Sequence, residues 1–328
     1  MTLSAIVLAA GKATRMKSQR VKVLHEICGR PMLAYVLDAA RAAGVERLVV
    51  VVGHDRMHVM EAFRDDPGIT WVAQDQQNGT GHAVLVTRPA FFHNNGSASA
   101  AAQTPASHPA DESSPTDSAD STFILAGDGP LIRPETLRQL AQRHAETGAA
   151  VTLATAVLDD PTGYGRIVRN AAGELLGIVE QSVATEEQQK IREVNPSYYL
   201  FQTQDLFSAL DQVQPNNPKG EYYLTDTLAI LRQAGKKLAA VAAVPREDVL
   251  SINTRRELAV VNRVMQQRIQ EQIMAGGVTL ISPENTWIEY GATIGEESVI
   301  EPFTFIGGTA QISPGTRVAA GSVIGRKR

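Results

Sequence analysis

The residues after 277 carry a strict six-residue spacing of aliphatic side chains. Seven of them follow one another without a gap: Ile288, Ile294, Ile300, Ile306, Ile312, Val318 and Ile324. Glycine and other small residues fill many of the positions between them. A hexapeptide repeat is typical of a left-handed parallel β-helix, in which each aliphatic side chain points into a triangular prism. Seven hexads correspond to just over two coils, so the repeat predicts a short β-helix over residues 278–328.

The first 150 residues instead alternate short apolar runs with amphipathic stretches. The runs lie at 5–8, 48–52, 70–72 and 122–125, and the stretches with helical spacing lie at 31–43, 54–63, 81–87 and 134–147. This alternation predicts βαβ units, and hence an α/β fold with a doubly wound, mostly parallel, Rossmann-like sheet. Further along, the pattern predicts a hairpin at 164–180, a strand at 198–201 and a long helix at 254–274.

Residues 93–121 interrupt this pattern. These 29 residues contain seven alanines and seven serines, but no Ile, Leu, Val, Met, Phe, Trp or Tyr. Such a segment cannot bury enough apolar surface to offset the entropy of ordering it. We expect a disordered surface insertion, and the alternative is a docking segment.

Composition excludes several classes of protein. The 328 residues suffice for about two domains, and their net charge of −4 argues against a nucleic-acid partner. Cys28 is the only cysteine, which excludes a disulfide framework and a four-thiolate zinc site. No apolar run reaches 18 residues, so we expect no membrane partner. The amino terminus lacks a basic region followed by an apolar one, which predicts a cytoplasmic protein.

The first strand-to-helix junction is a candidate anion site. Small residues at 9–11 follow the buried run, and they would let free backbone N–H groups approach a phosphate. Between Met1 and His25 there are five cations and no acidic residue. The alternative is a solvated basic loop. The chain has no GxxxxGK[ST] phosphate loop, and Gly79-Thr80-Gly81 lacks the third glycine of a dinucleotide fingerprint.

A second candidate element is Gly127-Asp128-Gly129-Pro130, which follows the run at 122–125. An Asp at the carboxyl end of a parallel strand faces the ligand crevice of an open α/β sheet. A lone carboxylate there suits Mg²⁺ that is bound largely through water and substrate phosphates. The alternative is an Asp that only serves the turn before Pro130.

Together these elements resemble the GlmU family of bifunctional enzymes, which acetylate glucosamine-1-phosphate and couple N-acetylglucosamine-1-phosphate to UTP. The resemblance rests on LAAG-x-x-TRM at 8–16, Q-x-x-Q-x-GTGHA at 74–83, GD-x-PL at 127–131, DPTGYGRI at 160–167 and GEYY-x-TD at 220–226. It covers nearly the whole chain apart from the insertion. LAAG-x-x-TRM is shared with many nucleotidyltransferases, whereas DPTGYGRI and GEYY-x-TD are specific to this family among sugar-nucleotide transferases.

The resemblance implies Mg²⁺-dependent transfer of UMP from UTP to N-acetylglucosamine-1-phosphate. The products would be pyrophosphate and UDP-N-acetylglucosamine, a precursor of peptidoglycan and the cell envelope. The implied nucleotidyltransferase domain spans residues 1–253, and a linking helix spans 254–277. The implied roles are catalysis by Arg15 and Lys22; Mg²⁺ binding by Asp128 and Asn253; nucleotide binding by Leu8, Ala9, Ala10, Gly11, Gln74, Gln77, Gly79, Thr80, Ala126 and Gly127; and sugar binding by Gly165, Glu180, Asn195 and Tyr222.

Purely structural roles remain open for three of these residues. Gly165 could serve only a turn, Tyr222 could belong to the core, and Asn253 could simply precede a helix. The chain also departs from the family pattern. Ala13 replaces a glycine of GKGTRM, Gln181-Ser182-Val183 replaces HKD of EHKDA, and Pro196 follows Asn195 in place of Thr or Ala. Most departures fall on the sugar side, so another sugar-1-phosphate is the nearest rival substrate. A non-catalytic scaffold on the same fold is the rival of another class.

The β-helix of this chain is much shorter than that of the family, so we expect no acetyltransferase activity. We expect the short β-helix to serve assembly instead, as a homotrimer, because the family forms trimers through this element. The candidate contacts are four aromatic residues that would lie outside the prism: Trp287, Tyr290, Phe303 and Phe305. The alternative is a monomer whose β-helix packs on the long helix.

Overall fold

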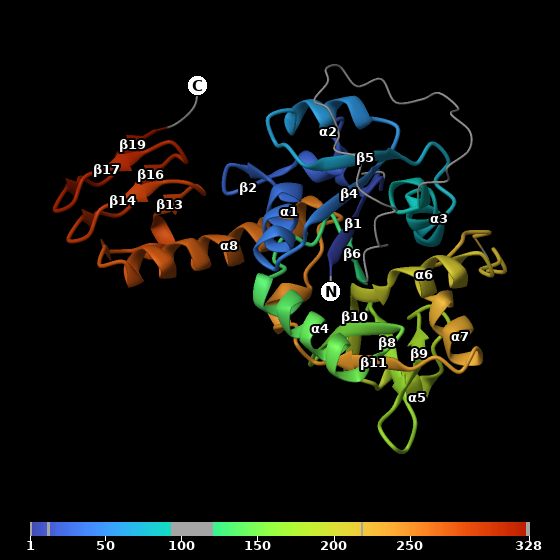
Figure 1. The fold of residues 1–328 in the computed structure, drawn as a ribbon. Coiled ribbons are helices and arrows are strands. Elements are labelled where there is room, and N and C mark those ends of the chain that lie inside the picture. The colour runs from blue at the N-terminus through green and yellow to red at the C-terminus, as the bar shows by residue number, and fades with distance from the viewer. Residues whose placement is uncertain (1, 12–13, 93–120, 218, 326–328) are drawn as a thin grey trace.

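The structure is a computed structural model, and it describes residues 2–11, 14–92, 121–217 and 219–325 (Figure 1). The expected insertion lies outside the described residues except for Ser121. Ala13, one of the departures from the family pattern, also lies outside them.

A nine-stranded sheet forms the centre of the amino-terminal part, with a main path of β11-β7-β10-β6-β1-β4-β5. Strand β1 (Leu3–Ala9) lies between β4 (Arg47–Val52) and β6 (Ser121–Ala126), and both pairs are parallel. Strand β5 (Ile69–Ala73) pairs in parallel with β4. The four apolar runs of the first half are therefore parallel neighbours, as the alternating pattern predicts.

The other half of the sheet is mixed. Strand β10 (Glu193–Gln202) is antiparallel to both β6 and β7 (Val151–Val157), and β11 (Leu238–Val241) pairs in parallel with β7. The expected hairpin is formed by β8 (Gly165–Arg169) and β9 (Leu175–Val179), and β8 joins the sheet through β10. The helix between β9 and β10, α5, is only four residues long (Glu186–Gln189), too short to cross a sheet face as a parallel βαβ connection usually does.

Helices cover both faces of the sheet, because consecutive strand residues point to opposite sides. Val7 of β1 belongs to one buried cluster and its neighbour Ile6 to the other. The first cluster includes residues of α1 and α4, and the second includes residues of α3, α6 and α7. The bounds are α1 Met32–Ala42, α2 Arg56–Ala62, α3 Thr80–Leu85, α4 Pro134–Thr147, α6 Thr203–Leu210 and α7 Asp226–Gln233.

Helix α8 (Arg255–Ala275) leads from the sheet to the β-helix (Figure 1). It begins with a capping box, in which the Thr254 side chain accepts from the backbone N–H of Glu257 and the Glu257 side chain accepts from that of Thr254. The expected helix at 254–274 is thus confirmed. Neither α8 nor any other helix within the described ranges is long and apolar enough to cross a membrane.

The hexad repeat forms the β-helix that it predicts. Eight two-residue strands, β12 to β19, pair in parallel into three sheets, with Ile288 opposite Ile306 and Ile306 opposite Ile324. One coil therefore spans 18 residues, or three hexads. The strands are β12 Thr279–Leu280, β13 Trp287–Ile288, β14 Thr293–Ile294, β15 Val299–Ile300, β16 Phe305–Ile306, β17 Gln311–Ile312, β18 Arg317–Val318 and β19 Val323–Ile324.

The β-helix packs on the linking helix. Gln266 of α8 is buried, and its side chain bonds to both the N–H and the carbonyl of Ile288. Gln270 donates to the carbonyls of Pro283 and Thr286 at 2.9 and 2.7 Å. The packing expected for the monomeric alternative is therefore present, and it involves β12 and β13.

Candidate active site

The carboxyl ends of β1, β4 and β6 lie side by side, since these strands are adjacent and parallel. The segment after β6 is fixed to β1 by a hydrogen bond from the N–H of Gly127 to the carbonyl of Leu8, at 3.0 Å. A Cβ atom at Gly127 would lie 2.9 Å from that same carbonyl oxygen, so the close approach requires glycine. The residues that follow the strands, including Gly11 and Asp128, therefore share one edge of the sheet.

Two cations and two oxygen-bearing side chains converge at this edge. The Lys22 ammonium donates to the Asp128 carboxylate and, at 2.8 Å, to Oδ1 of Asn253. Arg15 donates to the same Oδ1 at 2.9 Å. The four residues come from three separate parts of the chain, because Arg15 and Lys22 both lie between β1 and residue 26, and Lys22 is only 8% exposed. The structure thus brings together the expected catalytic pair and the expected metal ligands.

Backbone contacts also hold the two oxygen-bearing residues together. The N–H of Ile252 donates to the carbonyl of Asp128 at 3.1 Å, which joins the segment before α8 to the segment after β6. The backbone N–H of Asn253 donates to the Glu257 carboxylate at 2.7 Å. The helix cap is Thr254, so the Asn253 side chain does not cap the helix and faces the two cations.

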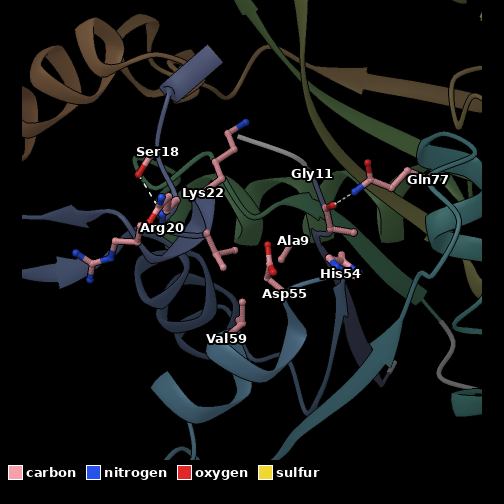
Figure 2. A pocket seen from close by; sticks show the side chains of 13 residues that line it. Ala9, Gly11, Ser18, Arg20, Lys22, His54, Asp55, Val59 and Gln77 are labelled. Carbon is pink, nitrogen blue, oxygen red and sulfur yellow. Dashed lines mark hydrogen bonds between the residues drawn. The ribbon is translucent and has the colours of Figure 1, made fainter. Parts of the chain in front are cut away.

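A pocket of about 180 Å³ opens beside this cluster. Figure 2 shows Asp55, His54 and Val59 on one side of it, with Lys22 and Gln77 among the other lining residues. Among the expected site residues, the pocket is lined by Ala9, Ala10, Gly11, Lys22 and Gln77. Three of the lining residues were not predicted from the sequence: Gly53, His54 and Asp55. They directly follow β4, and the rule that places Asp128 at the carboxyl edge of the sheet could have found them.

The expected nucleotide residues at the start of α3 form a compact turn. Gln74 is 4% exposed and donates to the carbonyl of Gly79 at 3.2 Å, and Gln77 donates to the carbonyl of Ala10. Gly79 has φ +104°, and a Cβ there would lie 2.5 Å from the carbonyl oxygen of Tyr222. Glycine is therefore required at position 79 both by the positive φ and by the close approach of the Tyr222 backbone. The Thr80 hydroxyl accepts from the N–H of Leu224 at 3.1 Å.

Tyr222 is half-buried and packs against the second core cluster. Its backbone N–H donates to the carbonyl of Asn78 at 2.7 Å, and its carbonyl accepts from the N–H of Gly81 at 2.8 Å. These contacts attach the segment around Tyr222 to the turn that begins α3. The residue therefore has a structural role.

The expected sugar residues meet the sheet edge at the hairpin. A Cβ at Gly165 would lie 2.8 Å from Cγ2 of Ile178 and 3.5 Å from the Glu180 carboxylate, so a close approach and not a turn requires this glycine. Enclosure by neighbouring atoms and the negative charge of Asp226 raise the pKa of Glu180. The Asn195 side chain donates to Tyr199 at 2.6 Å and accepts from the N–H of Ser197, so its amide group is engaged within the protein.

Gln181, one of the departures on the sugar side, has defined partners. Its Oε1 accepts from Nη2 of Arg166 at 2.7 Å and from the N–H of Gly163 at 3.3 Å. Arg166 is only 1% exposed, and it also donates to the carbonyl of Tyr164. Gln181 therefore holds the end of β9 to the segment that leads into β8, on one side of Gly165 and Glu180.

Asp128 and Asn253 fit a divalent cation with oxygen ligands. A carboxylate oxygen and an amide oxygen already converge on one cation, the Lys22 ammonium. The described residues contain no group of three or more His, Cys, Asp or Glu side chains placed to hold a metal. One carboxylate and one amide suit Mg²⁺, which keeps several water ligands and is completed by substrate phosphates.

Comparison with known proteins identifies the fold and the family. A family model described as the MobA-like NTP transferase domain matches residues 5–194, more than half of the chain. The chain belongs to the MobA-like NTP transferase family. The sheet edge that carries Lys22 and Asp128 lies within the matched region. The expected nucleotidyltransferase fold is thereby confirmed.

This NTP transferase is similar to bifunctional GlmU proteins along nearly its whole length. It is 41% identical to the protein of Heliobacterium modesticaldum over 315 residues, which is 96% of this chain and 63% of that protein. It is 40% identical to that of Solibacter usitatus over 323 residues, 98% of this chain and 64% of that protein. The resemblance to the GlmU family is confirmed, and the chain spans just under two thirds of the length of these relatives.

A solved structure supports the fold alone. The crystal structure of UDP-glucose pyrophosphorylase complexed with UDP-glucose aligns with a TM-score of 0.60, over 82% of this chain and all of that chain, at 17% identity.

Proposed function

We propose that this NTP transferase is a sugar-1-phosphate nucleotidyltransferase that transfers UMP from UTP to N-acetylglucosamine-1-phosphate, with UDP-N-acetylglucosamine and pyrophosphate as products. The observation that carries the proposal is the convergence of Lys22 and Arg15 on the oxygens of Asp128 and Asn253, beside the small residues that end β1. The two substrates are those that the resemblance to the GlmU family implies. Residues 1–253 would form the catalytic unit, with α8 as the link to the β-helix.

The arrangement suits phosphoryl chemistry. A phosphate monoester has a second pKa near 6, so the attacking oxygen of a sugar-1-phosphate is mostly ionised at pH 7 and needs no general base. The main barrier is the repulsion between two anions and the charge that builds up at the α-phosphorus during in-line attack. Lys22 and Arg15 would neutralise that charge, and the turn at Gly79 would position the nucleotide. The proposed site therefore needs cations more than a nucleophilic side chain.

Asp128 and Asn253 would hold the divalent metal, which we take to be Mg²⁺. When bound, the metal would supply further neutralisation of the triphosphate and help to align it. The carboxylate of Asp128 would fix its position next to the phosphates, and Asn253 would add a neutral oxygen ligand.

The substrate assignment is tested by measuring pyrophosphate release from UTP with a panel of sugar-1-phosphates. We expect N-acetylglucosamine-1-phosphate to have the highest kcat/KM. A higher value for another sugar would favour the rival substrate, and the bonds of Gln181 to Arg166 and Gly163 would then be the first place to look for the cause. No release with any sugar and Mg²⁺ would favour a non-catalytic scaffold.

The metal role is tested with Asp128→Asn. We expect turnover to fall by at least about a hundredfold at saturating Mg²⁺, because metal-centred charge stabilisation contributes several kcal/mol to such reactions. Asp65→Asn is the matched control, since the Asp65 side chain is 92% exposed and Asp65 does not line the pocket. Turnover of Asp128→Asn within threefold of wild type would place the metal ligand elsewhere.

We also propose that the β-helix assembles three copies of the chain. Trp287, Phe305 and Val323 stand in register on one sheet of the prism, and Phe303 is 71% exposed. Tyr290 differs from the expected set, because its ring packs on Tyr35 of the same chain at 5.4 Å.

Light scattering on the full chain tests the assembly. We expect a trimer mass that falls to a monomer in Phe303→Glu but not in Met57→Glu, a control at an equally exposed apolar residue on α2. A monomeric wild type at micromolar concentration would contradict the proposal. The absence of acetyl transfer stays a prediction. It is tested by coenzyme A release from acetyl-coenzyme A and glucosamine-1-phosphate.

A further inference from the structure

The Lys22 ammonium lies between the two side-chain oxygens that we assign to the metal. It donates to the Asp128 carboxylate and to Oδ1 of Asn253. Lys22 begins a short 3-10 helix (Lys22–Leu24) and is nearly buried, whereas Arg15 is exposed and, among the described residues, donates to Asn253 and not to Asp128. Lys22 is therefore the cation that joins both oxygens.

This position conflicts with a metal ion on the same pair of oxygens. An ammonium and a divalent cation repel each other, and the repulsion is strong where little water separates them. The Asp128 side chain is 23% exposed and that of Lys22 is 10% exposed, so solvent screens the pair only in part. If the metal binds Asp128 and Asn253, the ammonium must move away from them.

We propose that Lys22 is a resident counter-cation that keeps free divalent metal off Asp128 and Asn253, so that metal enters together with a polyphosphate. This inference rests on the proposed function, since it takes the same two residues as the metal ligands. A triphosphate offers the displaced ammonium a new anionic partner, whereas free metal offers none. Lys22 lines the pocket with Ala10 and Gly11, so a phosphate held there would lie beside the Lys22 side chain.

The proposal also explains why a lysine suits this position. Its ammonium is a compact charge on a flexible stem, and it can exchange one anionic partner for another. Without a counter-charge, Asp128 would be an uncompensated carboxylate in a partly enclosed site, which is costly. Lys22 therefore stabilises the metal-free site and becomes available to the phosphates when metal is present.

The test is a titration of the nucleotide-free full chain with Mn²⁺, with free Mn²⁺ followed by electron paramagnetic resonance. We expect Lys22→Met to bind Mn²⁺ at least tenfold more tightly than wild type. Lys17→Met is the matched control, because it removes the same charge from an exposed position in the same segment, and we expect its affinity to stay within twofold of wild type. The double variant Lys22→Met with Asp128→Asn should lose the gain.

Lys22→Gln keeps a polar side chain and guards against a folding defect in the methionine variant. Thermal midpoints identify any variant that does not fold. If neither Lys22 variant gains affinity over Lys17→Met, or if the double variant keeps the gain, the proposal is wrong.

The outcome is separable from that of the proposed function. Wild type that transfers UMP in a metal-dependent way, with no gain in the Lys22 variants, would refute only the counter-cation role. A gain in Mn²⁺ affinity without nucleotide transfer to any sugar-1-phosphate would refute only the proposed reaction.

Discussion

Arg268 of α8 joins the linking helix to the proposed active site through a buried carboxylate. It donates to Asp248 and, at 2.9 Å, to the carbonyl of Leu131 in the segment after β6. Arg133 donates to the same carboxylate at 2.5 Å, and the Asp248 side chain is only 1% exposed. Replacing Arg268 with methionine keeps an unbranched apolar stem, and it removes the guanidinium group with both bonds.

The expected cost follows from these contacts. Removing one partner of a buried ion pair typically costs about 3–5 kcal/mol, and a hydrogen bond to a charged group contributes about 1.5–3 kcal/mol. Arg133 stays paired with Asp248, so the carboxylate keeps one counter-charge, and the Arg268 side chain is 24% exposed. Both facts favour the lower end of the range for a broken buried ion pair. We therefore expect Arg268→Met to lower the free energy of unfolding by about 3 kcal/mol.

Urea denaturation and thermal unfolding measure this loss. At about 2–4 °C per kcal/mol, the midpoint should fall by roughly 6–12 °C. Arg263→Met is the matched control, since Arg263 is exposed on the same helix, and it should change stability by no more than about 0.5 kcal/mol. If Arg268→Met is as stable as Arg263→Met, the network around Asp248 does not hold α8 to the segment after β6.

Three further predictions concern single sites. Gly79→Ala should raise the KM for UTP at least about tenfold, because the new Cβ would meet the backbone of Tyr222. Gly68→Ala is the control for backbone conformation alone, since Gly68 has φ +85° and a Cβ there would have no heavy atom within 4 Å. Burial lowers the pKa of His144 to about 4, so the folded protein binds this proton less readily than the unfolded chain does. The free energy of unfolding should therefore fall by about 2–3 kcal/mol between pH 7 and pH 4.5, as measured by urea denaturation. A fall of the same size in His144→Gln would contradict this prediction. Thr254→Ala should cost about 1 kcal/mol through loss of the α8 cap, and unchanged stability would mean that the cap does not limit unfolding.

Local sequence patterns predicted the main helices and strands of this fold. The six-residue spacing from Ile288 to Ile324 predicts the coils of the β-helix, because one aliphatic side chain per prism side is a local requirement. The first coil begins earlier, at Leu280, which lies eight residues before Ile288 and so escapes the strict repeat. The parallel strands β1, β4, β5 and β6 follow from the alternation of apolar runs and amphipathic stretches in the same way.

The proposed site depended on the sequence and on the tertiary structure in different ways. The sequence alone identified Asp128 and the residues that end β1, because the position of a residue after a strand is a local property, and resemblance supplied the roles of Lys22 and Asn253. Only the tertiary structure brought Lys22 and Asn253 to Asp128, across 106 and 125 positions of the chain, and it added His54 and Asp55. Contacts at such separations are decided by strand order and by the packing of α8 on the sheet, which the spacing of residues along the chain does not encode.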